Sequence, residues 1–151
     1  MDEKLITISG WHIKGLGAEG PNNELKEELM LFGQFVGDWE IVKARYIQAD
    51  GTWIQMRGEV HYGWILDGTA VQDVWLGYKP ESQEMTVFGT TIRFYDPKID
   101  AWHSTWLSPL KGLVRTFIAR KVKGEIILEG TTAEGYPEKW IFSEIEPNSF
   151  R

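Results

Sequence analysis

The sequence predicts an all-β fold, an up-and-down antiparallel barrel of about eight to ten strands preceded by a short helix. Apolar and polar residues alternate in successive runs from residue 38 onward, as they do in half-buried strands. Glycine-containing pairs typical of tight hairpin turns separate several runs: Asp50-Gly51, Asp67-Gly68, Lys123-Gly124 and Glu134-Gly135. The links are short, so strands adjacent in sequence are expected to pair, and closing the sheet into a barrel removes its two exposed edges.

Eight runs make up the expected strands. They cover residues 38–49, 52–66, 69–78, 86–95, 101–107, 113–122, 125–133 and 136–146. An eight-stranded barrel is wide enough for a filled core or for one small ligand. We expect an N-terminal arm over residues 1–22 and one barrel domain over residues 23–151, because a chain of 151 residues is most simply a single domain.

A short helix is expected before the first strand, in "NNELKEELMLFGQFV". Asn23 can cap it, and the glutamates that follow favour the positive end of the helix. Leu25, Leu29 and Phe32 share one face at helical spacing, and Gly33 marks the end.

Composition excludes several classes of function. The chain has no cysteine, a formal net charge of −6 and no block of lysine and arginine, so we expect no disulfide and no nucleic-acid partner. It has no apolar run of about 20 residues and begins with an acidic segment without a long apolar stretch, so we expect a cytoplasmic protein that does not interact with membranes. His12, His61 and His103 lack metal-ligand spacing, and we expect neither a metal nor a cofactor. A homodimer is left open.

The first hairpin predicts which side chains face the interior. A two-residue turn at Asp50-Gly51 places Trp39 opposite Tyr62, and puts Lys43 and Arg45 on the Trp39 face. That face is mostly apolar and belongs inside; it carries Trp39, Ile41, Ile54, Met56, Val60, Tyr62 and Trp64.

The second hairpin predicts a buried carboxylate. Through Asp67-Gly68, Tyr62 faces Asp73 and Val60 faces Trp75, so Asp73 points into the aromatic interior. A buried carboxylate must be paired, hydrogen-bonded or protonated. The candidate partners are Arg93, Arg115 and Arg120.

The inward faces of the fourth, sixth and seventh strands stay open. The fourth strand can present either Phe88, Ile92 and Phe94 or Thr91, Arg93 and Tyr95. In the later strands the turns at Lys123-Gly124 and Glu134-Gly135 place on one face Ile118, Arg120, Ile127, Glu129, Trp140 and Phe142. We favour this face as the inner one, although the opposite face, with Phe117, Ala119, Leu128 and Ile141, is equally apolar.

These faces suggest a pocket for a small hydrophobic or aromatic ligand, with an arginine available for an acidic group. The predicted ligand-binding residues are Tyr62, Trp64, Asp73, Trp75, Arg93, Tyr95, Trp102, Trp106, Arg120, Glu129 and Trp140. The alternative is an isomerase, cyclase or lyase that uses Asp73 or Glu129 as its acid or base. A structural or partner-binding domain is the third hypothesis. Gly37 and Trp39 are expected to be structural, with Trp39 as the floor of the barrel.

Gly37-Asp38-Trp39, after a short helix, resembles the signature at the first strand of lipocalins and other calycins. The order of "FVGDWE", "ILDGTAVQDVW", "TIRFYDPKIDAWHSTW" and "KWIFSEI" resembles a bacterial lipocalin-like family of unknown function, over roughly residues 32–150. The resemblance implies a calycin-type barrel and, by analogy, binding of a small ligand. It also implies a late cation stacked on the signature tryptophan, for which Lys139 and Arg151 are the candidates.

Overall fold

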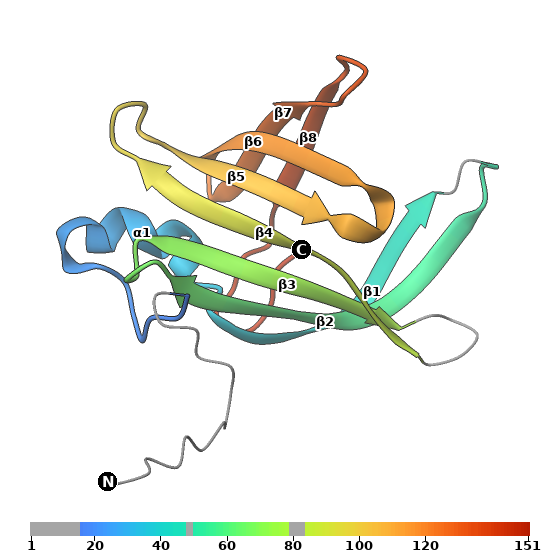
Figure 1. Ribbon diagram of the computed structural model, residues 1–151, viewed down its shortest axis with the longest axis horizontal. Coiled ribbons are helices and arrows are strands. Elements are labelled where there is room, and N and C mark those ends of the chain that lie inside the picture. The colour runs from blue at the N-terminus through green and yellow to red at the C-terminus, as the bar shows by residue number, and fades with distance from the viewer. Residues whose placement is uncertain (1–15, 48–49, 79–83) are drawn as a thin grey trace, which may run out of the picture.

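The computed structural model describes residues 16–47, 50–78 and 84–151, and they form one antiparallel sheet with a short helix (Figure 1). The sheet has eight strands, each hydrogen-bonded to its neighbours in sequence order. The strands are β1 (Gly37–Ile47), β2 (Trp53–Ile65), β3 (Ala70–Tyr78), β4 (Met85–Asp96), β5 (Ala101–Ser108), β6 (Leu113–Val122), β7 (Glu125–Thr131) and β8 (Pro137–Phe142). The predicted all-β, up-and-down topology is therefore confirmed.

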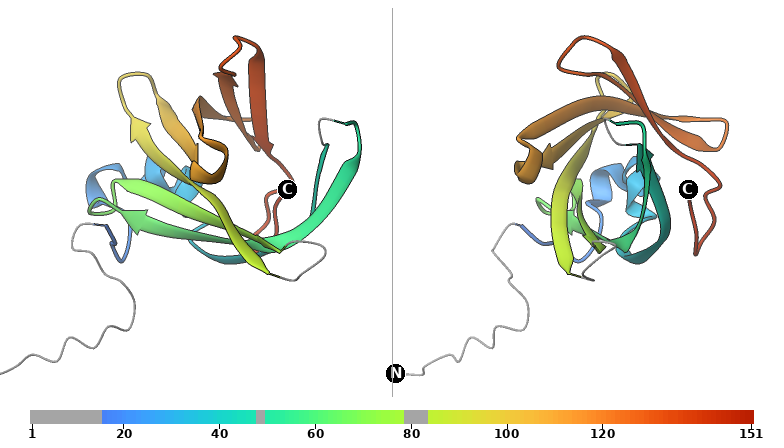
Figure 2. Two further views of the ribbon diagram at one scale, coloured as in Figure 1. Left: turned by 45° about the vertical axis from the view of Figure 1, so that its right-hand side comes forward. Right: turned by 90° about the vertical axis from the view of Figure 1, so that its right-hand side faces the viewer.

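The sheet curls strongly but its ends do not meet. In the right-hand view of Figure 2 it forms an incomplete ring, with the helix α1 (Lys26–Gly33) at the far end. Within the described residues the ladder runs from β1 to β8 without a pairing between these two strands, so the structure is a half-barrel. The predicted closure by hydrogen bonds between the outer strands is not seen.

The helical segment begins with a 3₁₀ turn, one residue earlier than the sequence suggested. The Asn22 side chain, rather than that of Asn23, accepts the hydrogen bond from the backbone N–H of Glu24 (3.0 Å), and it caps the 3₁₀ turn η1 (Asn23–Leu25) that leads into α1. Leu29 and Phe32 are buried as predicted, and α1 ends at Gly33. A side chain at Gly33 would overlap the ring of Trp64, so the absence of a Cβ lets the helix lie directly on β2.

One β-bulge changes the register of the first hairpin. Trp39 pairs with Val60 and not with Tyr62, because Ile47 next to the turn pairs with Trp53, one residue from the predicted register, and the pairing shifts by one more residue between Ile41 and Ala44. The overall shift relative to the prediction is two residues at Trp39, which keeps Trp39 on the inner face. Beyond the bulge Arg45 pairs with Gln55 and is exposed, so its predicted place on the Trp39 face is wrong.

The second hairpin and the fourth strand show which side chains face inward at the centre of the sheet. Tyr62 pairs with Asp73 and Val60 with Trp75, as predicted from the Asp67-Gly68 turn. In β4 the buried residues are Gly89, Thr91 and Arg93, so this strand turns its polar alternative inward.

The last hairpin corrects the favoured faces of β6 and β7. Lys123-Gly124 forms the predicted turn, but Glu129 pairs with Lys139 and not with Trp140, because the β7–β8 loop covers residues 132–136 and its pairing register differs from the predicted one by one residue. This one-residue slip puts Trp140 on the face of Leu128. The inner residues are therefore Phe117, Ala119, Ile126, Leu128, Trp140 and Phe142.

The tightly packed core lies at the α1 end of the half-barrel. It brings together Leu29, Phe32, Phe35, Tyr62, Trp64, Val71, Trp102, Phe117, Ala119, Ile126 and Leu128. The chain returns to this end after β8, where Ser143 and Arg151 exchange two backbone hydrogen bonds of 2.7 and 2.9 Å. Phe150 then packs between Phe35 and Phe142 (ring centroids 4.7 and 5.7 Å), beside the open edge of β1.

The segment before the helix is described only from residue 16. The Ala18 backbone N–H donates to the carbonyl of Trp64 (2.9 Å), which attaches the segment to the end of β2. The rest of the predicted arm, with His12, lies outside the described residues. None of the helices in the described ranges has the length and apolar character needed to span a membrane.

Candidate ligand-binding surface on the inner face

A buried ion pair joins β3 and β4 on the inner face. The Arg93 guanidinium donates through Nη1 to Oδ2 of Asp73 at 2.6 Å, and the two side chains are 2% and 0% exposed. The other Asp73 oxygen accepts the backbone N–H of Thr91 at 2.9 Å. Sequence reasoning placed Asp73 correctly and named Arg93 among its candidate partners, and the structure selects Arg93.

Aromatic rings surround the charged partner. The guanidinium carbon of Arg93 lies 4.9 Å from the ring centroid of Phe32, 5.6 Å from Tyr62 and 5.8 Å from Phe142. These cation–π contacts and the carboxylate of Asp73 together compensate the burial of the arginine. Arg93 therefore lies inside the core at the α1 end.

Four polar atoms around this pair are buried without a hydrogen-bond partner among the described residues. They are the Tyr62 hydroxyl, Thr91 Oγ1, Arg93 Nε and Ser104 Oγ. The residues are neighbours in the sheet, because Asp73 pairs with both Tyr62 and Thr91, and Arg93 pairs with Ser104. We refer to Tyr62, Asp73, Thr91, Arg93 and Ser104 as the polar cluster. Buried polar groups are nearly always hydrogen-bonded, so four unpaired ones in one place require an explanation.

Next to the polar cluster, toward the end of the half-barrel away from α1, a row of aromatic side chains lines the inner face. Trp106 lies edge-on to Trp75 and to Trp140, with ring centroids 6.2 Å apart in each case, and Phe117 lies 4.4 Å from Trp140. We call Trp75, Trp106, Phe117 and Trp140 the aromatic wall. Trp75 is 37% exposed, while Phe117 is buried, so the wall is accessible at its Trp75 end. Trp106 pairs with Thr91, which joins the wall to the polar cluster.

A second ion pair lies beside the wall. Arg115, which pairs with Trp106, approaches Oε2 of Glu138 through Nε at 3.1 Å, without the angle of a hydrogen bond. The indole N–H of Trp140 donates to Oε1 of the same glutamate at 3.2 Å. Sequence reasoning named Arg115 only as a partner for Asp73 and missed Glu138. The signal for Glu138 was the alternation along its strand, since Glu138 lies two residues before Trp140, which was already predicted to face inward.

Three other predicted ligand contacts lie elsewhere in the fold. Trp64 is 7% exposed and packs against Gly33 of α1, so it is part of the closed core. Tyr95 and Trp102 pair across β4 and β5 and line a groove of about 730 Å³ between α1 and the ends of β4, β5 and β6. The Tyr95 hydroxyl donates to Asp100 at 2.8 Å.

Two predicted site residues lie on the outer face, which contradicts their predicted inward placement. Glu129 is paired with Lys139 at 2.7 Å, and both side chains are 58% exposed. Arg120 pairs with Ile127 across β6 and β7 and donates to the Ile99 carbonyl at 3.4 Å. The favoured face of these strands was the wrong one, and Arg120 instead lines the groove beside α1 together with Tyr95 and Trp102.

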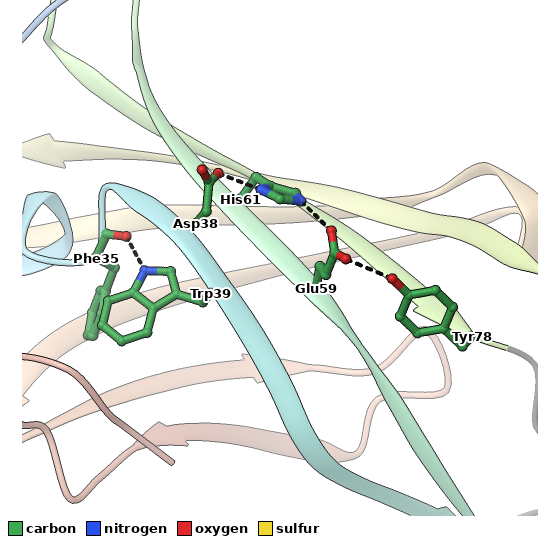
Figure 3. Close-up of polar contacts among 6 residues, drawn as sticks. All are labelled: Phe35, Asp38, Trp39, Glu59, His61 and Tyr78. Carbon is green, nitrogen blue, oxygen red and sulfur yellow. Dashed lines mark hydrogen bonds and ion pairs between the residues drawn. The ribbon is translucent and has the colours of Figure 1, made fainter. Parts of the chain in front are cut away.

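Trp39 fills the position expected of a floor residue. Its indole N–H donates to the carbonyl of Phe35 at 2.6 Å, which fixes the turn between α1 and β1 (Figure 3). Two rings pack on Trp39 edge-on: Phe150, with ring centroids 4.9 Å apart, and Phe35, at 6.4 Å. Lys139 and Arg151, the candidates for a stacked cation, instead pair with Glu129 and Glu144.

The outer face of the first three strands carries a chain of polar contacts, drawn in Figure 3. His61 places Nδ1 at 2.6 Å from Asp38 and Nε2 at 3.0 Å from Glu59, and the Tyr78 hydroxyl donates to Glu59 at 2.7 Å. The hydrogen bond with Asp38 raises the pKa of His61, and Glu59 adds to this effect. Both imidazole nitrogens face carboxylates, so neither is free to act on a substrate. Among the described residues, no three or more histidine, aspartate or glutamate side chains are arranged so that they could hold a metal ion.

Comparisons with protein-family models, with curated proteins and with solved structures find no match for the chain.

Proposed function

We propose that the protein binds a small, mainly apolar and planar molecule on the inner face of the half-barrel, against the aromatic wall. The observation that carries this proposal is the series of indole rings that leads from the exposed Trp75, through Trp106, to Trp140. Concave, mostly apolar surfaces with a few convergent polar groups are typical of small-molecule sites. The Arg115–Glu138 pair and the adjoining polar cluster supply such groups.

The fold is compatible with the binding of a small ligand, although it does not indicate which one. We infer that the chain is a divergent relative of the calycins, because a short helix, a Gly-x-Trp at the first strand and a curled eight-stranded meander occur together. The inferred relationship points to ligand binding by analogy only, and the argument from the wall does not depend on it.

The acid–base alternative loses support from the contacts of its two candidate carboxylates. Asp73 is held by Arg93 and by the Thr91 N–H, and Glu129 is paired with Lys139 on the outer face. A general acid or base must reach the substrate and exchange its proton. We therefore propose binding and no reaction.

Titration with N-phenyl-1-naphthylamine, a neutral dye that fluoresces in apolar surroundings, tests the proposal. We expect saturable binding by the wild-type protein. The variant Trp75→Ala should bind at least about tenfold more weakly, since a stacked aromatic ring contributes of the order of 1 kcal/mol or more beyond its buried area. Native mass spectrometry of protein purified from its own host would then reveal the molecule that it carries.

A matched control is available on the same sheet. Trp53 is 66% exposed and lies on β2 opposite Ile47, next to the inward-facing Ile54 and therefore on the outer face. Trp53→Ala removes an indole of the same size and should leave the dissociation constant unchanged. Equal losses in both variants, or no saturable binding by the wild type, would contradict the proposal.

A further inference from the structure

The polar cluster suggests what the proposed ligand carries at one end. Its unpaired atoms are three hydroxyls and one guanidinium N–H, and the four residues are between 1% and 5% exposed. An unpaired buried polar atom costs roughly 1–3 kcal/mol, so each of these atoms requires a hydrogen-bond partner from water or from a ligand. A ligand group that hydrogen-bonds with these atoms would recover the lost interactions.

The Asp73–Arg93 ion pair and the neutral Tyr62 hydroxyl limit the charge that the ligand group can carry. The Asp73 carboxylate compensates the Arg93 guanidinium at 2.6 Å, so the pair has no net charge. Burial raises the pKa of the Tyr62 hydroxyl, which therefore stays protonated and neutral. A ligand carboxylate placed here would be a third buried charge without a counter-ion, which is strongly unfavourable.

The available groups suit a neutral oxygen. Hydroxyls both donate and accept hydrogen bonds, and the Arg93 N–H donates, so together they can solvate a hydroxyl or a carbonyl. Thr91 is the cross-strand partner of Trp106, which places the cluster beside the aromatic wall. A planar molecule stacked on the wall at Trp106 would therefore have the cluster, through Thr91, beside its polar end.

We propose that Tyr62, Thr91, Arg93 and Ser104 bind the neutral hydroxyl or carbonyl group of a planar apolar ligand and discriminate against a carboxylate. This inference rests on the proposed function, because it concerns the polar end of the same ligand. The sequence suggested an acidic group on the ligand, and the inference replaces it with a neutral group.

Calorimetric titration with three probes of the same ring system tests the inference. The probes are naphthalene, 2-naphthol and 2-naphthoate. The wild-type protein should bind 2-naphthol about tenfold more tightly than either of the others, a difference equal to one or two well-made hydrogen bonds.

Variants of the cluster should remove the preference without unfolding the protein. Tyr62→Phe and Ser104→Ala each delete an unpaired buried hydroxyl, so their melting temperatures should stay the same or rise. Their preference for 2-naphthol over naphthalene should fall by about three- to tenfold. Ser108→Ala is the matched control, since Ser108 is equally buried on β5 and its hydroxyl already donates to the Phe88 carbonyl at 2.8 Å.

The outcomes separate this inference from the proposed function. If 2-naphthoate binds as tightly as 2-naphthol or more tightly, the neutral-group inference is wrong and the aromatic site stands. Equal affinities for 2-naphthol and naphthalene would mean that only water satisfies the cluster, which also overturns the inference. If none of the three probes binds, the proposed function fails together with it.

Discussion

The Asp73–Arg93 pair is the residue-level feature with the clearest energetic consequence. A buried ion pair contributes little net stability, because removing both charges from water offsets their attraction. Loss of one partner is different, because it leaves the other charge buried and uncompensated. The rings of Phe32, Tyr62 and Phe142 leave Arg93 little access to water, with 2% of its side chain exposed.

We therefore expect Asp73→Ala to lower the free energy of unfolding by about 3–5 kcal/mol. The variant Glu129→Ala, which breaks the exposed pair with Lys139, should change it by less than about 1 kcal/mol. Urea denaturation followed by tryptophan fluorescence measures both values. Similar values for the two variants would show that Arg93 finds compensation elsewhere.

At the scale of elements, the stability of the β1–β2 hairpin depends on pH through His61, which lies on its outer face. The Asp38 carboxylate on β1 raises the pKa of His61 on β2, and Glu59 on the same strand adds to the shift. A group whose pKa is raised in the folded state binds its proton more tightly there than in the unfolded chain. The stabilisation is complete below the ordinary histidine pKa of about 6.5 and is lost as the pH rises through the raised value.

The corresponding prediction compares two carboxylates of β1. Between pH 6 and pH 8 the free energy of unfolding of the wild type should fall, and Asp38→Asn should flatten this decline. Glu40→Gln removes a carboxylate that pairs with Arg57 at 2.5 Å and should keep the slope. Denaturant titrations at several pH values give the slopes; an unchanged slope in Asp38→Asn would assign the pH dependence to other groups.

The elements also show where prediction from sequence succeeds and where it fails. The Asp67-Gly68 turn has positive φ at both residues, so its geometry could be inferred, and the inward position of Asp73 followed from it. The Glu134-Gly135 pair lies inside a longer loop, and a register shift of one residue across that loop put Arg120 and Glu129 on the face opposite to Trp140. A single residue of loop length exchanges the two faces of a strand, and a sequence contains little that fixes that length when both faces are apolar.

At the scale of the whole molecule, the order of the strands was predictable and the closure of the sheet was not. Short links force neighbours in sequence to pair, whereas the contact between the first and last strands depends on sheet curvature and on the terminal segments. Here the chain after β8 brings Phe150 against Phe35 and Trp39. Side-chain packing thus takes the place of a β1–β8 ladder among the described residues.

This packing leads to a prediction about the half-barrel as a unit. Phe150 contacts Phe35, Trp39, Tyr62 and Phe142, so it connects the α1 end with the first and last strands. Because Phe150 is partly exposed, Phe150→Ala should lower the free energy of unfolding by about 2–4 kcal/mol, at or just below the range for a fully buried phenylalanine.

Tyr136, which is 69% exposed in the β7–β8 loop, provides the control, and Tyr136→Ala should stay within about 0.5 kcal/mol of the wild type. Urea denaturation measures both variants, and near-ultraviolet circular dichroism reports on the ring cluster. If Phe150→Ala unfolds at the wild-type midpoint, the C-terminal segment does not hold the sheet together. The curl of the half-barrel then depends on the strands and α1 alone.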